Sequence, residues 1–211
     1  MSHTLHRRAG SDGLKDDYVI LMMANRPYTA EITTTAMFRG CLDIMLKHNP
    51  VNMGGMGMGH LYNSTAEDIL RFVDNMAPGR PMIHCVFSNR DDLVGALREL
   101  KEADYGISAI VSGLVDSTDC CIREAGLKRH SINYSLGVWG NTDALPDEGI
   151  LQIASLCGHA MISFNLIKKK IEDIKEGKTT TEKAAVEMAK PCVCGIFNPV
   201  RAQRLLEEFL S

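Results

Sequence analysis

The pattern of apolar and polar positions changes along the chain, from alternating strand and helix signals to helix signals alone. The run 18–23 is continuously apolar, which is typical of a strand covered on both faces. Similar signals predict further strands at 51–53, 81–87, 107–111 and 131–139. Apolar residues at helical spacing between these runs predict helices at about 35–47, 64–73, 90–100 and 117–125.

Helix-sized connections between apolar strands favour an α/β domain with a mostly parallel sheet and helices on both of its faces. A ferredoxin-like sheet with some antiparallel strands is the alternative. After about residue 142 the strand signals stop, and capping residues with Gly and Pro stops predict a C-terminal segment of four helices. We therefore expect a flexible tail at 1–16, an α/β domain at 17–142 and a helical segment at 143–211.

Charge and the distribution of apolar residues argue against some classes of function. The 211 residues carry a formal net charge of −3, so no basic surface argues for nucleic acid. No apolar run is long enough to span a bilayer, and the polar first residues do not resemble a signal peptide. These features predict a cytoplasmic protein without membrane or nucleic-acid partners. They leave a homo-oligomer open.

Cysteine supplies the strongest chemical signal. The chain has seven cysteines. An odd number cannot all pair in disulfides, and disulfides are rare in a reducing compartment. Cys157, Cys192 and Cys194 fall at predicted breaks between helices, where a core cysteine is not expected. Gly158 and Gly195 beside them allow the backbone to approach closely, and helix starts supply free amide N–H groups. Such surroundings lower a thiol pKa and favour metal binding.

Three thiolates suit a cubane 4Fe-4S iron–sulfur cluster with one iron open or held by another ligand. They also suit zinc with His159 as the fourth ligand, although a single residue between Cys192 and Cys194 is fewer than a zinc knuckle usually has. Metal-free thiols remain a third interpretation, in which Cys157 simply ends an apolar helix.

The first functional hypothesis is thus an iron–sulfur protein of anaerobic-type metabolism. An open iron would act as a Lewis acid or sulfur acceptor, as in a lyase or a sulfur-transfer enzyme, with His159 as the catalytic proton-transfer group. A redox or sensing module needs no catalytic base. The corresponding partners are a small-molecule substrate or a redox partner protein.

Other residues support a second hypothesis, in which the chain is a metal-free α/β protein that binds a small molecule or has a regulatory role. The Gly- and Met-rich stretch 53–60 predicts a loop in which Gly55 and Gly57 approach a ligand. Arg26 and Arg90 each follow an expected strand, and in a parallel sheet both would lie at one edge and bind a carboxylate or phosphate. A zinc-stabilised interaction protein is the third hypothesis.

Overall fold

The computed structural model describes residues 3–8, 10, 13–24, 35–76 and 82–211. The described residues form a sheet of five strands. These strands are β1 (Tyr18–Ala24), β2 (Asn52–Gly55), β3 (Gly59–His60), β4 (Met82–Phe87) and β5 (Ile107–Ser112). The helices are η1 (His3–His6), α1 (Thr35–Lys47), α2 (Ala66–Asp74), α3 (Arg90–Ala103), α4 (Val115–Glu124), η3 (Thr142–Ala144), α5 (Glu148–Ser155), α6 (Phe164–Lys175), α7 (Thr181–Ala189) and α8 (Pro199–Leu210).

The sheet is antiparallel, so the prediction of a mostly parallel sheet is wrong. Its order is β3-β2-β4-β1-β5, and every recorded neighbouring pair runs antiparallel. The helical connections do join strands of the same direction, since β1 and β2 both oppose β4. Another strand lies between the two members of each such pair. This is the split arrangement of the ferredoxin-like alternative, and connection length alone cannot distinguish it from a parallel sheet.

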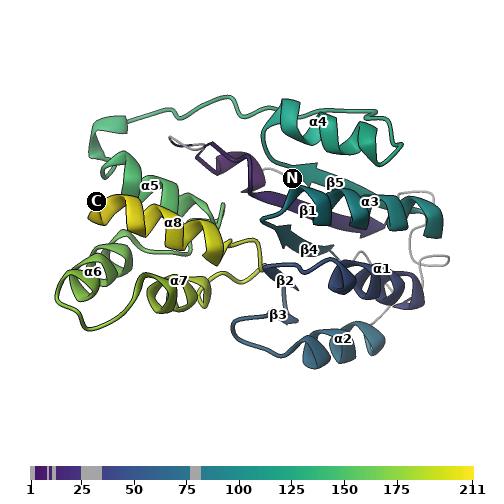
Figure 1. Ribbon diagram of the computed structural model, residues 1–211, viewed down its shortest axis with the longest axis horizontal. Coiled ribbons are helices and arrows are strands. Elements are labelled where there is room, and N and C mark those ends of the chain that lie inside the picture. The colour runs from purple at the N-terminus through teal and green to yellow at the C-terminus, as the bar shows by residue number, and fades with distance from the viewer. Residues whose placement is uncertain (1–2, 9, 11–12, 25–34, 77–81) are drawn as a thin grey trace.

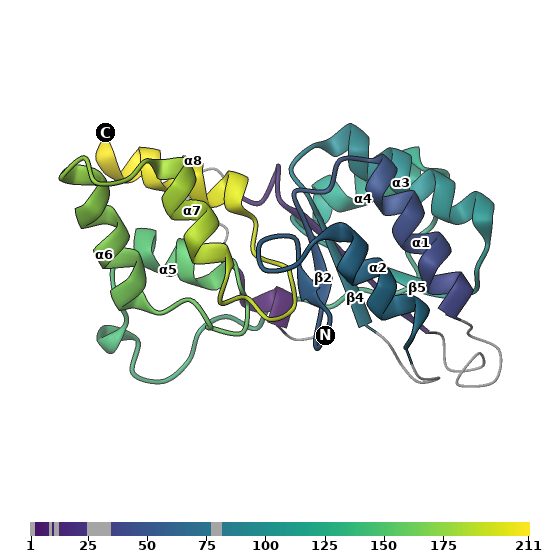
Figure 2. The same ribbon diagram turned by 90° about the horizontal axis from the view of Figure 1, so that it is seen from below.

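Helices cover both faces of the sheet, as Figures 1 and 2 show. On one face, Ile20 and Met22 of β1 pack in a core formed with α1 to α4. On the other face, Val19 of β1 and Val86 of β4 pack in a second core formed with α5 to α8. The continuous apolar run of β1 is explained by this double cover, because successive strand residues point to opposite faces. The predicted four-helix C-terminal segment is confirmed.

The strand candidate at 131–139 is wrong, since all of these residues are described and none is in a strand. Its alternating residues stay in solvent, with Leu136 86% and Trp139 83% exposed. Alternation fits a strand, but a strand also requires a neighbour for its backbone hydrogen bonds, which this segment lacks.

The described part of the N-terminal segment 1–16 bonds to the residue before β1 and to the C-terminal helices. Arg7 forms a buried ion pair with Asp17, and Arg8 pairs with Glu148 of α5. Arg201 of α8 donates a hydrogen bond to the carbonyl of Gly13. Across the described residues, no helix is long and apolar enough to cross a bilayer.

Candidate metal centre

The predicted metal ligands lie at two helix junctions, as expected. Cys157 follows α5, and Cys192 and Cys194 lie in the connection between α7 and α8. All three side chains are buried in the second core, against the C-terminal helices. The connection is short because Pro191 cannot continue α7 and Pro199 starts α8, so the two cysteines are held in a tight turn.

The sulfur atoms contact one another in a row. Cys157 contacts the Cys192 thiol, and the Cys192 and Cys194 Sγ atoms lie 4.0 Å apart. The Cys194 Sγ lies 3.5 Å from the His159 Nδ1. Among the described residues, no group of three or more Cys, His, Asp or Glu side chains is already positioned to hold a metal ion. The cysteine and histidine side chains are therefore adjacent, but they do not surround a common metal position.

Backbone amides point at each of the three sulfurs. The Cys157 thiol accepts hydrogen bonds from the N–H groups of Met161 and His159. Amides on the second loop do the same, with Phe197 and Cys194 donating to Cys192 and Ile196 donating to Cys194. Such N–H···S bonds stabilise thiolate over thiol, which is the form that binds metal.

Contacts among the three thiols shift their pKa values in opposite directions. Contacts with the thiols of Cys157 and Cys194 lower the pKa of Cys192 far below the usual range. Contact with Cys192, together with burial, raises the pKa of Cys157 and of Cys194. Of the three thiols, that of Cys192 is therefore the one that loses its proton most readily. A bound cation would displace the thiol protons that remain.

The cysteine loop packs directly on β2. Gly195 has φ +74°, and a Cβ there would lie 2.8 Å from the Gly54 amide nitrogen. The Asn52 Nδ2 donates a 2.9 Å hydrogen bond to the Phe197 carbonyl. Glycine at 195 therefore allows the loop backbone to touch that of β2, and this contact fixes the loop to the sheet.

The glycine-rich stretch forms a hairpin. Gly55 lies in β2 opposite Gly59, and a Cβ at Gly55 would lie 2.6 Å from the Met82 carbonyl oxygen. Gly57 lies in the turn with φ +85°, a conformation that glycine adopts without strain. Both glycines thus have local backbone roles, and their predicted contact with a ligand stays a prediction.

His60 is a buried residue near the cysteines that the sequence did not reveal. Its Nδ1 accepts a 3.2 Å hydrogen bond from the Tyr62 N–H, so its Nε2 donates to the Lys190 carbonyl at 3.3 Å. Burial lowers its pKa despite the nearby Cys192, which favours this neutral form. Because both nitrogens are used, His60 holds the segment before Cys192 in place and is not a spare ligand. Its two-residue strand carries no clear pattern in the sequence.

The predicted arginine pair is not supported by the sheet. Arg26 lies outside the described residues. The C-terminal end of β1 pairs with the start of β4, so the ends that precede Arg26 and Arg90 lie at opposite ends of the sheet. Arg90 instead forms an ion pair with Glu124 of α4, and its Nη2 lies 3.4 Å from the Cys120 Sγ. The reason for joining the two arginines in one anion site no longer holds.

His159 lies on the solvent side of the centre. Its side chain is exposed, as are those of Met161 and Val193 on the two cysteine loops. The sulfurs behind these residues are buried. A molecule or protein approaching the sulfurs from solvent would therefore meet the His159 ring first.

Fold and site together define an α/β protein in which a buried row of thiols lies where a helical layer packs on β2 of an antiparallel sheet. Comparison with family models, curated proteins and solved structures finds no match to this chain. Its chemistry is therefore argued from the residues themselves.

Proposed function

We propose that this protein binds an iron–sulfur cluster through Cys157, Cys192 and Cys194. The observation that carries this proposal is that each of three touching, buried thiols accepts hydrogen bonds from backbone amides. Hydrogen bonds to sulfur and exclusion of water are the protein features that stabilise such clusters and set their potential. The donor set is soft, as iron–sulfur chemistry requires.

Three protein thiolates leave one iron of a cubane open or available to another ligand. When bound, the cluster would supply an electron, or a Lewis-acid iron for a lyase or a sulfur-transfer step. His159 is placed to donate or accept a proton at its imidazole beside Cys194, or to serve as that further ligand. Its exposure suits access by a small-molecule substrate or a redox partner protein.

A single zinc ion is the second candidate, and the separations of the ligand atoms are compatible with it. Tetrahedral zinc, with bonds of about 2.3 Å to sulfur and 2.0 Å to nitrogen, holds two sulfurs about 3.8 Å apart. The same geometry puts sulfur and nitrogen about 3.5 Å apart. The observed 4.0 Å and 3.5 Å are close to both values. Zinc there would stabilise the junction between the helical layer and the sheet rather than perform redox chemistry.

Metal analysis of protein purified without oxygen tests the proposal. After incubation with iron and sulfide, we expect a brown protein with several iron and sulfide per chain and visible absorption that bleaches in air. Replacing Cys157, Cys192 or Cys194 singly by serine should lower the iron content. Cys121→Ser is the matched control, because Cys121 is also a buried thiol but lies in the other core.

The outcomes separate the candidates. A colourless protein with one zinc per chain, lost in the same three variants, would establish the zinc site instead. Equal metal content in all four variants, or a stable protein without metal, would refute both sites and favour the metal-free small-molecule hypothesis. We place the protein in a reducing, cytoplasmic compartment because all seven cysteines are free thiols.

A further inference from the structure

The connection between α4 and η3 is a long stretch without helix or strand that carries a strand-like pattern. Residues 127–139 are all described, and they cross from the layer of α4 to that of α5 (Figure 1). From 131 to 138, small polar residues or glycine alternate with apolar residues. The apolar residues and the adjoining tryptophan are exposed, namely Ile132, Tyr134, Leu136, Val138 and Trp139. An exposed apolar row of this length indicates an interaction site.

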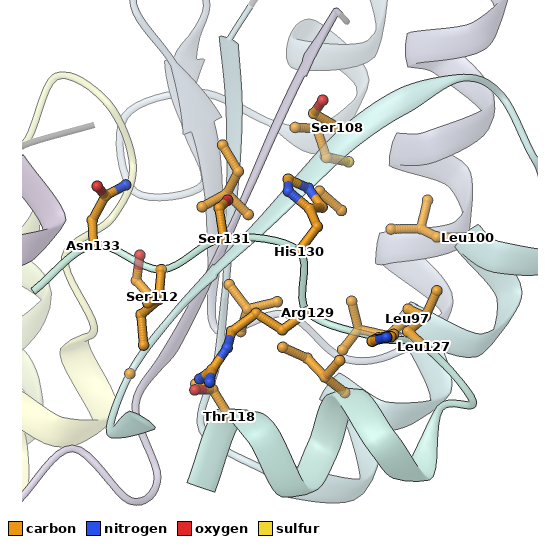
Figure 3. Close-up of a pocket in the computed structure, with 18 of the residues that line it drawn as sticks. Leu97, Leu100, Ser108, Ser112, Thr118, Leu127, Arg129, His130, Ser131 and Asn133 are labelled. Atoms are coloured by element: carbon orange, nitrogen blue, oxygen red, sulfur yellow. The ribbon is translucent and has the colours of Figure 1, made fainter. Parts of the chain in front are cut away.

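The sheet of the same chain does not cover this row. A cavity of about 760 Å³ lies between β5 and residues 127–135, with Leu97, Leu100 and Leu127 gathered on one side of it (Figure 3). β5 is the last of the described strands in the sheet order, and β1 is its recorded neighbour. The segment therefore runs beside the edge of the sheet without pairing with it. Strand-like backbone at a sheet edge is a template for pairing with another chain.

The segment 131–139 complements a second copy of itself. In an antiparallel pair centred on Ser135, Tyr134 lies opposite Leu136 of the second copy, and Ile132 lies opposite Val138. Because opposite residues in such a pair point to the same face, the apolar side chains of both copies gather on one face. Gly137 has φ +90°, so it must straighten for the pair to form, and glycine does so without steric cost.

The charges at the two ends of the segment favour the antiparallel direction. Lys128 precedes the segment and Asp143 follows it, and both side chains are exposed. An antiparallel pair brings the lysine end of one copy beside the aspartate end of the other. A parallel pair would bring like charges together, which destabilises strand pairing.

The exposed apolar area is sufficient for a dimer. The exposed parts of the five apolar side chains amount to roughly 600 Å² per copy. Two copies together can therefore remove up to about 1,200 Å² of apolar surface from water, which is the lower end of the range for stable interfaces. A dimer of this size is expected to dissociate at micromolar concentrations, about 1–100 µM.

We propose that this protein forms a two-fold dimer in which the segments 131–139 of two copies pair antiparallel, with Ser135 of one copy opposite Ser135 of the other. The partner is a second copy of this chain, and the interface covers the apolar row that the monomer leaves exposed. The proposal does not depend on a metal at the cysteines.

Sedimentation velocity of the full chain over a concentration series tests the dimer. We expect a monomer–dimer equilibrium that Leu136→Asp weakens about tenfold or more, because the new carboxylate would lie among apolar side chains of the second copy. Leu136 is 86% exposed, so the substitution leaves the fold of the monomer intact. Met56→Asp is the matched control, since Met56 is an exposed apolar residue outside the segment and its substitution should leave the dimer unchanged.

Cysteine cross-linking tests the register. In a Cys120→Ser background, which removes the exposed native thiol, Ser135→Cys should give a disulfide-linked dimer on mild oxidation. Opposite Cα atoms in an antiparallel pair lie about 4.5–5.5 Å apart, which suits a disulfide. Ser131→Cys is the control, because the two copies of that residue would lie about 27 Å apart and should not link.

Three results would overturn the proposal. The first is a chain that stays monomeric up to about 500 µM, which would leave the apolar row to its own β5 edge or to a different protein. The second is a dimer that Leu136→Asp does not weaken, since its interface would lie elsewhere. The third is equal linking of Ser131→Cys and Ser135→Cys. None of these results depends on the metal content of the protein.

Discussion

At the scale of single residues, the cysteines differ in burial according to their surroundings. Cys41 and Cys85 are packed in the core between the sheet and α1 to α4. Cys120 is exposed on α4. Apolar neighbours on the same strand or helix face explain the burial of Cys41 and Cys85.

Thiol alkylation at pH 8 should follow this division. Burial raises the pKa of Cys41 to about 12, and burial also raises that of Cys85, so both stay protonated at pH 8 and are shielded as well. The thiolate is the reactive form, so iodoacetamide should label Cys120 first in the native protein. Peptide mass spectrometry, with urea-unfolded protein as the control, reports the order. Equal labelling of Cys41 and Cys120 in the native state would contradict the packing.

Gly195→Ala should destabilise the protein more than Gly177→Ala does. Both glycines have positive φ, +74° and +70°, so each alanine costs about 1–2 kcal/mol of backbone strain. At Gly177 nothing lies within 4 Å of the new Cβ, whereas at Gly195 it meets the Gly54 backbone. We expect a further loss of about 1–3 kcal/mol in urea unfolding for Gly195→Ala. Equal stability of the two variants would contradict the contact with β2.

At the scale of elements, α8 connects the helical layer to the sheet. Its N-cap Asn198 accepts a hydrogen bond from the Arg201 N–H. The same side chain donates to Asp17 before β1 and to the Ser88 hydroxyl after β4, both at 2.9 Å. Asn198 followed by Pro199 is a local pattern typical of a helix start. The bonds to the sheet cannot be predicted from that pattern, because they join residues far apart in the chain.

Asn198→Ala should cost more than loss of a helix cap alone. Removing the cap costs about 0.5–2 kcal/mol, and leaving the buried Asp17 without this donor adds about 1–3 kcal/mol. Ser163→Ala is the matched control, since Ser163 caps the exposed start of α6 by its bond to the Leu166 N–H. Urea unfolding of both variants measures the difference. Equal losses would show that the sheet contacts of Asn198 contribute nothing.

At the scale of the whole molecule, the sheet is stable only with cover on both faces. Val19 and Val86 are fully buried against the C-terminal helices, which begin after residue 142 (Figure 2). The described N-terminal residues also contact the C-terminal helices, through the ion pair of Arg8 with Glu148. The expected boundary between 142 and 143 therefore divides the chain at a change of element pattern, across which the two parts share a core.

A chain that ends at residue 142 should not behave as an independent domain. It would expose the β1 and β4 face that α5 to α8 cover, and exposed apolar faces of this kind promote association. We expect strong binding of a hydrophobic dye and large species in size-exclusion chromatography, compared with the full chain. A monomeric truncated protein with a cooperative thermal transition would contradict this.

The sequence by itself determined what depends on neighbours along the chain. Most strands and helices, and the positions of three cysteines at helix junctions, follow from local pattern and backbone chemistry. Tertiary structure decided whether neighbouring strands are parallel or antiparallel. A strand inserted between the two strands that a helix connects leaves the length of that connection unchanged, so the sequence does not reveal it. It also brought the sulfurs into contact, placed His60 behind them and buried Arg7 beside Asp17. These contacts join residues distant in sequence, and only the packing of both layers on one sheet creates them.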